Sequence, residues 1–139
     1  MLVDPTKTPQ VRNIGWQQLQ YSRVTINFND PGIAAGVAFG VLPQYAFITA
    51  IQSYVETAFN AGTTNNVSIG TTAATGNEIS GNIAGQTAGY ANATAAAGLG
   101  CGVTTAGPVT MYAKYAQTGG AATAGKIHIV VAYLLNNDL

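Results

Sequence analysis

The chain has 139 residues, which suits one domain that buries most of its apolar side chains in a single core. Only 7% of the residues are charged, and the five acidic and five basic side chains cancel each other. The basic residues are scattered, whereas a nucleic-acid-binding surface needs clustered Lys and Arg to neutralise phosphates, so we expect no nucleic-acid partner. No apolar run approaches the roughly 20 residues that cross a bilayer, so we also expect no membrane partner.

A surface so poor in charge suits a protein that works packed against other protein. A secreted or surface β protein with an uncharged polar coat fits the composition equally well. Cys101 is the single cysteine, so the chain has no intrachain disulfide and core packing must hold the fold. The first residues lack the apolar stretch of a signal peptide, which predicts synthesis and assembly in a cytoplasm.

Residues 1–19 contain two prolines and isolated apolar residues without helical or strand period. They predict an extended N-terminal arm before a single domain over residues 20–139. Trp16 either fills the base of the core, the commoner role, or anchors the arm on another molecule. We predict that the arm reaches a neighbouring subunit, and its apolar residues Val11, Ile14 and Trp16 are candidate protein contacts.

Apolar and polar residues alternate from Tyr21 to Asn29, which predicts a half-buried antiparallel strand. Asn29–Gly32 has the proline and glycine of a tight turn. The apolar segment Ile33–Leu42 contains Gly36 and Gly40, and we expect these glycines to permit a bend or the close approach of another backbone.

The segment Tyr45–Phe59 fits two structures. An apolar residue recurs at every fourth position in part of it, as in an amphipathic helix. However, nine of its fifteen residues are β-branched or aromatic, which favours a strand followed by a turn and a second short strand at Val67–Ile69. The strand would direct one set of residues inward, namely Tyr45, Phe47, Ile51, Val55 and Phe59. It would direct Gln52, Tyr54 and Glu56 outward.

Residues 71–107 are rich in Ala, Gly and Thr, and we expect long ordered loops there with a helical turn near residues 90–97. Two alternating segments, Pro108–Gln117 and Lys126–Leu135, predict the last strands. The far half of the second is apolar on both faces, which predicts a central place in a sheet. Several strands, turn-rich joins and no long helix together predict an all-β sandwich or barrel.

Few residues are available for catalysis or metal binding. His128 is the only histidine and Cys101 the only thiol, so zinc lacks its usual set of four ligands. A Cys101–His128 dyad or a Glu56–Glu78 glycosidase pair is conceivable, but a packed histidine, a small buried thiol and unrelated carboxylates are far commoner. The glycines around Cys101 lack the spacing of a phosphate-binding loop. We therefore expect no enzyme, no metal site and no cofactor.

Four segments of the chain form a recognisable set: TAFNAGTTNNVSIG at 57–70, VTMYAKY at 109–115, QTGGAATAG at 117–125, and residues 127–133. Together they resemble the capsid decoration, or cement, proteins of tailed bacteriophages, including one from a short-tailed phage of Bordetella. The similarity spans about residues 21–135 and leaves the arm outside. It implies a jelly-roll-type β-sandwich that binds the exterior of the capsid without catalysis. The long Ala/Gly/Thr-rich loops and the extended N-terminal arm predicted above complete this expected fold.

The same resemblance implies three further properties: the major capsid protein as partner, a homodimer or homotrimer, and assembly into virions in the host cytoplasm. Four tyrosines opposite the predicted core or in loops are candidate protein contacts, or else they simply cover the sandwich. They are Tyr21, Tyr54, Tyr90 and Tyr112. A second hypothesis is a carbohydrate- or receptor-binding sandwich on a phage fibre or tail, and a third is an enzyme that uses Cys101 and His128.

Overall fold

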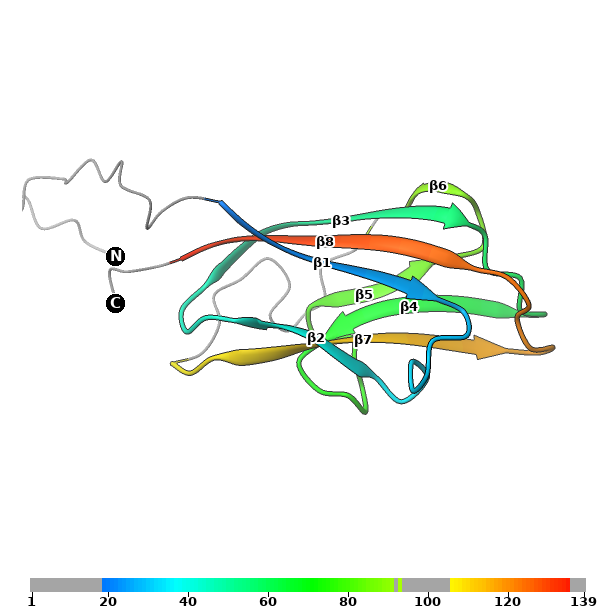
Figure 1. The fold of residues 1–139 in the computed structure, drawn as a ribbon, viewed down its shortest axis with the longest axis horizontal. Helices are drawn as coiled ribbons and strands as arrows, with labels where there is room; N and C mark the ends of the chain where they lie inside the picture. The colour runs from blue at the N-terminus through cyan, green and yellow to red at the C-terminus, as the bar shows by residue number, and fades with distance from the viewer. Residues whose placement is uncertain (1–18, 92, 94–105, 136–139) are drawn as a thin grey trace, which may run out of the picture.

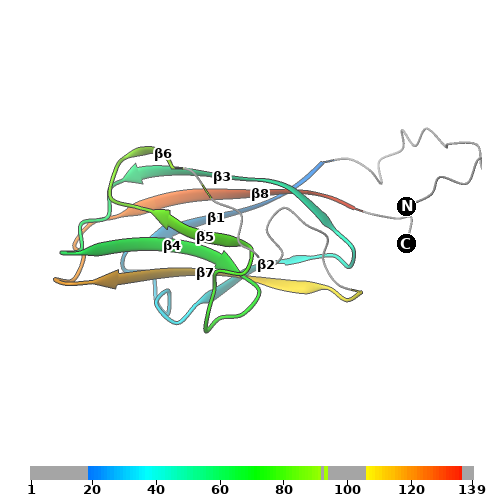
Figure 2. The same cartoon turned by 180° about the vertical axis from the view of Figure 1, so that it is seen from behind.

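The computed structural model describes residues 19–91, 93 and 106–135, which form a sandwich of two antiparallel four-stranded sheets (Figure 1). The strands are β1 (Gln20–Asn27), β2 (Val37–Leu42), β3 (Phe47–Thr57), β4 (Thr64–Gly70), β5 (Ser80–Ala84), β6 (Gly89–Ala91), β7 (Val109–Thr118) and β8 (Lys126–Leu134). One sheet has the order β1-β8-β3-β6 and the other β2-β7-β4-β5. This is the strand order of a jelly roll, so the predicted fold class is confirmed. Figure 2 shows the two sheets from behind, stacked one on the other.

The strand β8 lies between β1 and β3, as its two apolar faces predicted. Its inner residues Ile127, Ile129 and Val131 are fully buried, and they pair in register with inner residues of both neighbouring strands. The strand β1 keeps the predicted alternation along its whole length. The predicted strands Pro108–Gln117 and Lys126–Leu135 are confirmed as β7 and β8.

The ambiguous segment forms β3, so the strand prediction is confirmed and the helix is excluded. The predicted inner face is right at Val55 but wrong at Phe47, whose side chain is 42% exposed, while its neighbour Ile48 is buried. The register of β3 against β8 skips a residue between Ile48 and Ala50. A β-bulge there shifts the alternation by one position, and period-2 reasoning cannot place a bulge.

The region 71–107 contains two strands, β5 and β6, that the sequence did not predict. β5 pairs with β4, and β6 pairs with β3 over three residues. The helical turn expected near residues 90–97 is wrong at its start, because Tyr90 and Ala91 belong to β6. Residues 92 and 94–97 lie outside the described residues. Small residues have weak preferences of their own, so pairing with an existing strand decides their structure.

The inner faces of the two sheets form one apolar core. Its largest members are at most 2% exposed: Ile26, Leu42, Ile48, Phe59, Ile69, Ile79, Ile83, Met111, Tyr115, Ile127 and Ile129. Gly36 has φ 97°, and a Cβ there would lie 2.5 Å from the carbonyl oxygen of Ala73. The close backbone approach expected at this glycine is thus confirmed.

Candidate functional site

The β1-β8-β3-β6 sheet has one side that faces away from the core, and we call this side the outer face. It carries most of the exposed aromatic and charged side chains of the described residues. Alternation along each strand directs these side chains away from the core. The outward-facing side chains that matter below, polar and apolar ones included, are Tyr21, Arg23 and Thr25 of β1, Lys126, His128 and Val130 of β8, Gln52, Tyr54 and Glu56 of β3, and Tyr90 of β6.

Two tyrosines form an aromatic ledge at the edge of this face. Tyr54 of β3 is directly opposite Tyr90 of β6, and their rings meet edge to face with centroids 5.3 Å apart. Tyr90 is 93% exposed, although its backbone is paired in a sheet. The hydroxyl of Ser53 donates a hydrogen bond of 2.5 Å to the carbonyl oxygen of Ala91, which fixes β6 against β3. The ledge therefore stands on two paired strands and not on a loop.

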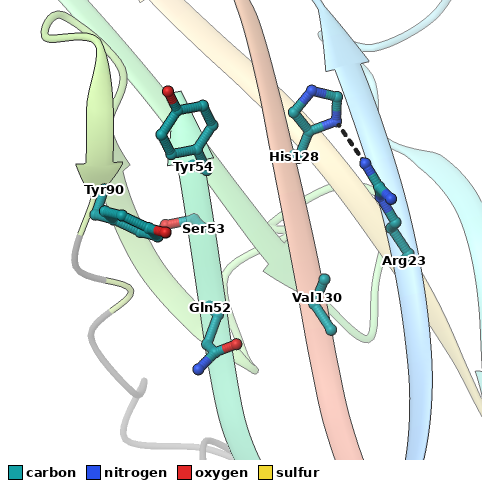
Figure 3. A pocket seen from close by; sticks show the side chains of 7 residues that line it. All are labelled: Arg23, Gln52, Ser53, Tyr54, Tyr90, His128 and Val130. Atoms are coloured by element: carbon teal, nitrogen blue, oxygen red, sulfur yellow. Dashed lines mark hydrogen bonds between the residues drawn. The ribbon is translucent and has the colours of Figure 1, made fainter. Parts of the chain in front are cut away.

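A depression of about 240 Å³ lies beside the ledge (Figure 3). Its lining comes from β1, β3, β6 and β8, namely Arg23, Gln52, Ser53, Tyr54, Tyr90, His128 and Val130. A second depression of about 360 Å³ shares Gln52, Ser53 and Tyr90 with the first. The second depression is lined otherwise by Ile51, Ala91 and Ala93, which pack against the core, so the two depressions adjoin at the edge formed by β3 and β6.

His128 is the centre of a hydrogen-bond network across β1, β8 and β3. Its Nδ1 lies 2.9 Å from Thr25 Oγ1 and 3.3 Å from Arg23 Nη2, and its Nε2 lies 2.6 Å from Glu56 Oε2. A guanidinium only donates, so Nδ1 accepts, and the Nε2–H donates to the carboxylate. Lys126 Nζ lies 2.9 Å from the same Glu56 oxygen.

Glu56 stands at a second β-bulge, where the register of β3 skips from Val55 to Thr57. A bulge re-aims the side chain of the extra residue, and here the carboxylate reaches two residues of β8. The hydrogen bonds from His128 and then from Lys126 lower the pKa of Glu56, because both stabilise the ionised carboxylate.

Thr25, His128 and Glu56 follow the order of hydroxyl, imidazole and carboxylate found in catalytic triads. The Glu56 side chain is 46% exposed and shared with Lys126, so it orients the imidazole weakly. Triad chemistry also depends on a site from which water is excluded. We therefore interpret these residues as a hydrogen-bond network that links β1, β8 and β3 and holds their charged side chains in place on the outer face.

The structure brings together three of the residues predicted as protein contacts. Tyr21, Tyr54 and Tyr90 all lie on the outer face, whereas Tyr112 of β7 belongs to the other sheet. The arm residues Val11, Ile14 and Trp16 lie outside the described residues. Their role as contacts stays a prediction.

Sequence reasoning missed Arg23 and Gln52 as members of the site. Both are outward-facing in the predicted alternation, and this was the one signal available. Their proximity to Tyr90 depends on the order β1-β8-β3-β6 and on the unpredicted strand β6.

The conceivable Glu56–Glu78 pair is not formed. Glu56 is bound to residues of β8, whereas Glu78, in the segment between β4 and β5, accepts hydrogen bonds from Thr71 N–H and from the hydroxyls of Thr72 and Thr75. Burial would raise the pKa of Glu78, but these hydrogen bonds outweigh it and lower the pKa to about 2.

Metal and membrane sites are not seen in the described part of the chain. No group of three or more His, Cys, Asp or Glu side chains within it could hold a metal ion. Cys101 falls outside the described residues, so the structure does not place it relative to His128. Over the same described residues, no helix has the length and hydrophobicity needed to span a bilayer.

The comparisons with known proteins identify a shared fold. No family model and no curated protein matches this chain. Among solved structures, it is similar to a chain of the cyanophage Pam1 capsid asymmetric unit, with a TM-score of 0.68. The match covers 97% of this chain and 98% of that chain at 17% sequence identity. At this identity the likeness shows a shared fold.

Proposed function

We propose that this protein is a structural component of a phage virion, which binds the exterior of the capsid and cements neighbouring capsid subunits. The observation that carries the proposal is the end-to-end likeness to a chain of a phage capsid asymmetric unit. The four segments that resemble phage cement proteins support it independently, because that resemblance is one of sequence and not of fold.

The low charge of the chain suits this role. A mature head must resist the outward pressure of packaged DNA, whose phosphates repel one another. A protein that bridges subunits adds binding free energy that must be lost before the shell opens. Burying Ala, Thr and Tyr surface against the shell carries a smaller desolvation penalty than burying ions. Many copies on a symmetric shell multiply a modest contact.

We propose the major capsid protein as the partner and a homodimer or homotrimer as the bound form. The arm at residues 1–19 would reach the neighbouring subunit through its apolar residues Val11, Ile14 and Trp16. We also propose Tyr112 as a contact with the shell; it lies on the other sheet from Tyr54 and Tyr90, so this contact would leave the outer face free.

The experiment mixes the purified chain with expanded heads that lack it, and follows binding by electron microscopy and the resistance of the heads to heat and chelator. We expect saturable binding at hundreds of copies per head and a higher temperature of head opening. Deleting residues 1–19, which precede β1, should weaken attachment while the sandwich still unfolds cooperatively. Absence of binding to heads would refute the cement role, and full binding without the arm would refute the role of the arm.

The aromatic depression favours a second candidate, a carbohydrate- or receptor-binding sandwich on a fibre or tail. The copy number in purified virions separates the two, because a cement protein occurs at hundreds of copies and a tail or fibre protein at a few.

A further inference from the structure

We propose that the depression beside Tyr90 binds an acidic glycan. In this site the rings of Tyr54 and Tyr90 stack on the sugar, and Arg23 pairs with a carboxylate of the sugar. The inference goes beyond the cement role and does not depend on it, because it rests on side chains of the outer face alone.

Tyr90 offers an exposed aromatic surface for stacking. A ring that is 93% exposed on a paired strand leaves a large apolar surface in water, and Tyr54 braces it from one edge. The C–H groups of a pyranose ring form a flat apolar surface that covers an aromatic ring, while the hydroxyls at its rim stay available for hydrogen bonds. Sugar-sized ligands bind in such half-apolar depressions with a few convergent polar groups.

The lining of the depression also holds hydrogen-bond donors that could bind the polar groups of a sugar, namely the Arg23 guanidinium and the Gln52 amide. The nearby carboxylate of Glu56 is bound to His128 and Lys126. Among the described residues, the guanidinium of Arg23 has no carboxylate partner and hydrogen-bonds only to His128. A guanidinium fork matches a carboxylate in a bidentate arrangement. The side-chain amide of Gln52 has no hydrogen-bond partner in the described part of the chain. Figure 3 shows both side chains on the lining of the depression.

The shape selects a chain of sugars over a small anion. The two depressions of about 240 and 360 Å³ adjoin, because both are lined by Gln52, Ser53 and Tyr90. Arg23 on β1 and Tyr90 on β6 have two strands between them, so an oligosaccharide would stack one ring on Tyr90 and present the carboxylate of another ring to Arg23. On a virion, many copies of such a site would convert weak binding to an acidic surface polysaccharide into strong adhesion.

The test measures binding of two acidic glycans, tetragalacturonate and sialyllactose, to the full-length chain by calorimetry. The uncharged counterpart of tetragalacturonate is its methyl ester, and that of sialyllactose is lactose. We expect saturable binding of at least one acid, about tenfold weaker binding of its uncharged counterpart, and weakening by salt. Arg23→Gln should reduce the affinity for the acid to that for the counterpart. Tyr90→Ala should weaken binding at least about tenfold, since it removes the stacking surface. Tyr90→Phe should keep it.

Tyr112→Ala, on the other sheet, is the matched control and should bind like the natural chain. Because Tyr90 is exposed, its variants should unfold at the same temperature as the natural chain. If Arg23→Gln unfolds early, Gln52→Ala tests the polar wall instead, with an expected loss of affinity. No saturable binding to either acid, equal binding of acid and counterpart, or an unchanged affinity of Tyr90→Ala would overturn the proposal. Loss of head binding by Tyr90→Ala without any glycan binding would assign the ledge to a protein interface and overturn it too.

Discussion

Replacing Asn65 tests how a polar side chain supports the apolar sandwich on which the outer face depends. Asn65 belongs to β4, is 1% exposed, and lies beneath the turn that joins β3 to β4. Its Oδ1 accepts hydrogen bonds from the Tyr115 hydroxyl at 2.6 Å and from Ala61 N–H at 3.0 Å. Its Nδ2 donates to the Ala61 carbonyl oxygen at 3.2 Å. One side chain therefore ties the turn to β4 and β7.

The magnitude follows from these three hydrogen bonds. Asn65→Ala removes all of them, and each contributes about 1 kcal/mol to the free energy of unfolding. Tyr115 keeps its longer contact of 3.2 Å to Gln117 Oε1, so its hydroxyl is not left without a partner. We expect a loss of about 2–4 kcal/mol and a fall in Tm of roughly 10 °C.

Tyr115→Phe isolates one bond of the three. It keeps the ring that packs on Phe59 with centroids 4.6 Å apart, and it leaves Asn65 Oδ1 with the Ala61 N–H. We expect a loss of about 1 kcal/mol. Burial raises the pKa of Tyr115, in keeping with a hydroxyl that stays protonated and donates. In a double-mutant cycle the two substitutions should cost about 1 kcal/mol less together than the sum of the two alone.

The assay is urea unfolding of the full chain, followed by fluorescence and circular dichroism. Asn66→Ala is the matched control, because Asn66 is the next residue of β4 and its side chain makes no hydrogen bond to the described residues. The reasoning is refuted if Asn65→Ala costs no more than Asn66→Ala, or if the cycle shows no coupling between Asn65 and Tyr115.

Two further predictions concern loops. Because its folded-state pKa is lowered from 4.5 to about 2, Glu78 adds stability above pH 4.5 that is lost as the pH falls towards 2. Solvent screening reduces the contribution to about 1–2 kcal/mol, so Glu78→Gln should cost that much at pH 7 and nothing near pH 2 in unfolding titrations; a pH-independent difference would contradict this. At Gly125, where φ is 149°, an alanine Cβ would lie 2.2 Å from the buried Phe59 ring. Gly125→Ala should cost about 2–3 kcal/mol, whereas Gly120→Ala, with open space around its Cβ position, should be nearly neutral in thermal unfolding; equal effects would refute the steric argument.

The proposed site shows where prediction from sequence stops. Tyr54 and Tyr90 were predicted as contacts because tyrosines that lie opposite a core or in loops are frequent at protein interfaces, but nothing in the sequence indicated that their rings touch. Contact between residues 36 positions apart required β6, and β6 is a three-residue strand of small side chains around Tyr90. Its structure comes from pairing with β3, which local preference does not encode.

By itself, the sequence determined that β1, β3, β7 and β8 are strands and which side chains of β1, β7 and β8 face the core, because alternation is a local property of the chain. Tertiary structure alone decided the two bulges of β3, the strands β5 and β6, and the order β1-β8-β3-β6. The physical reason is that a strand acquires its partner, its register and its bulges only when two distant segments exchange backbone hydrogen bonds. The outer face, with Arg23, Gln52 and Tyr90 on three different strands, is a product of that pairing.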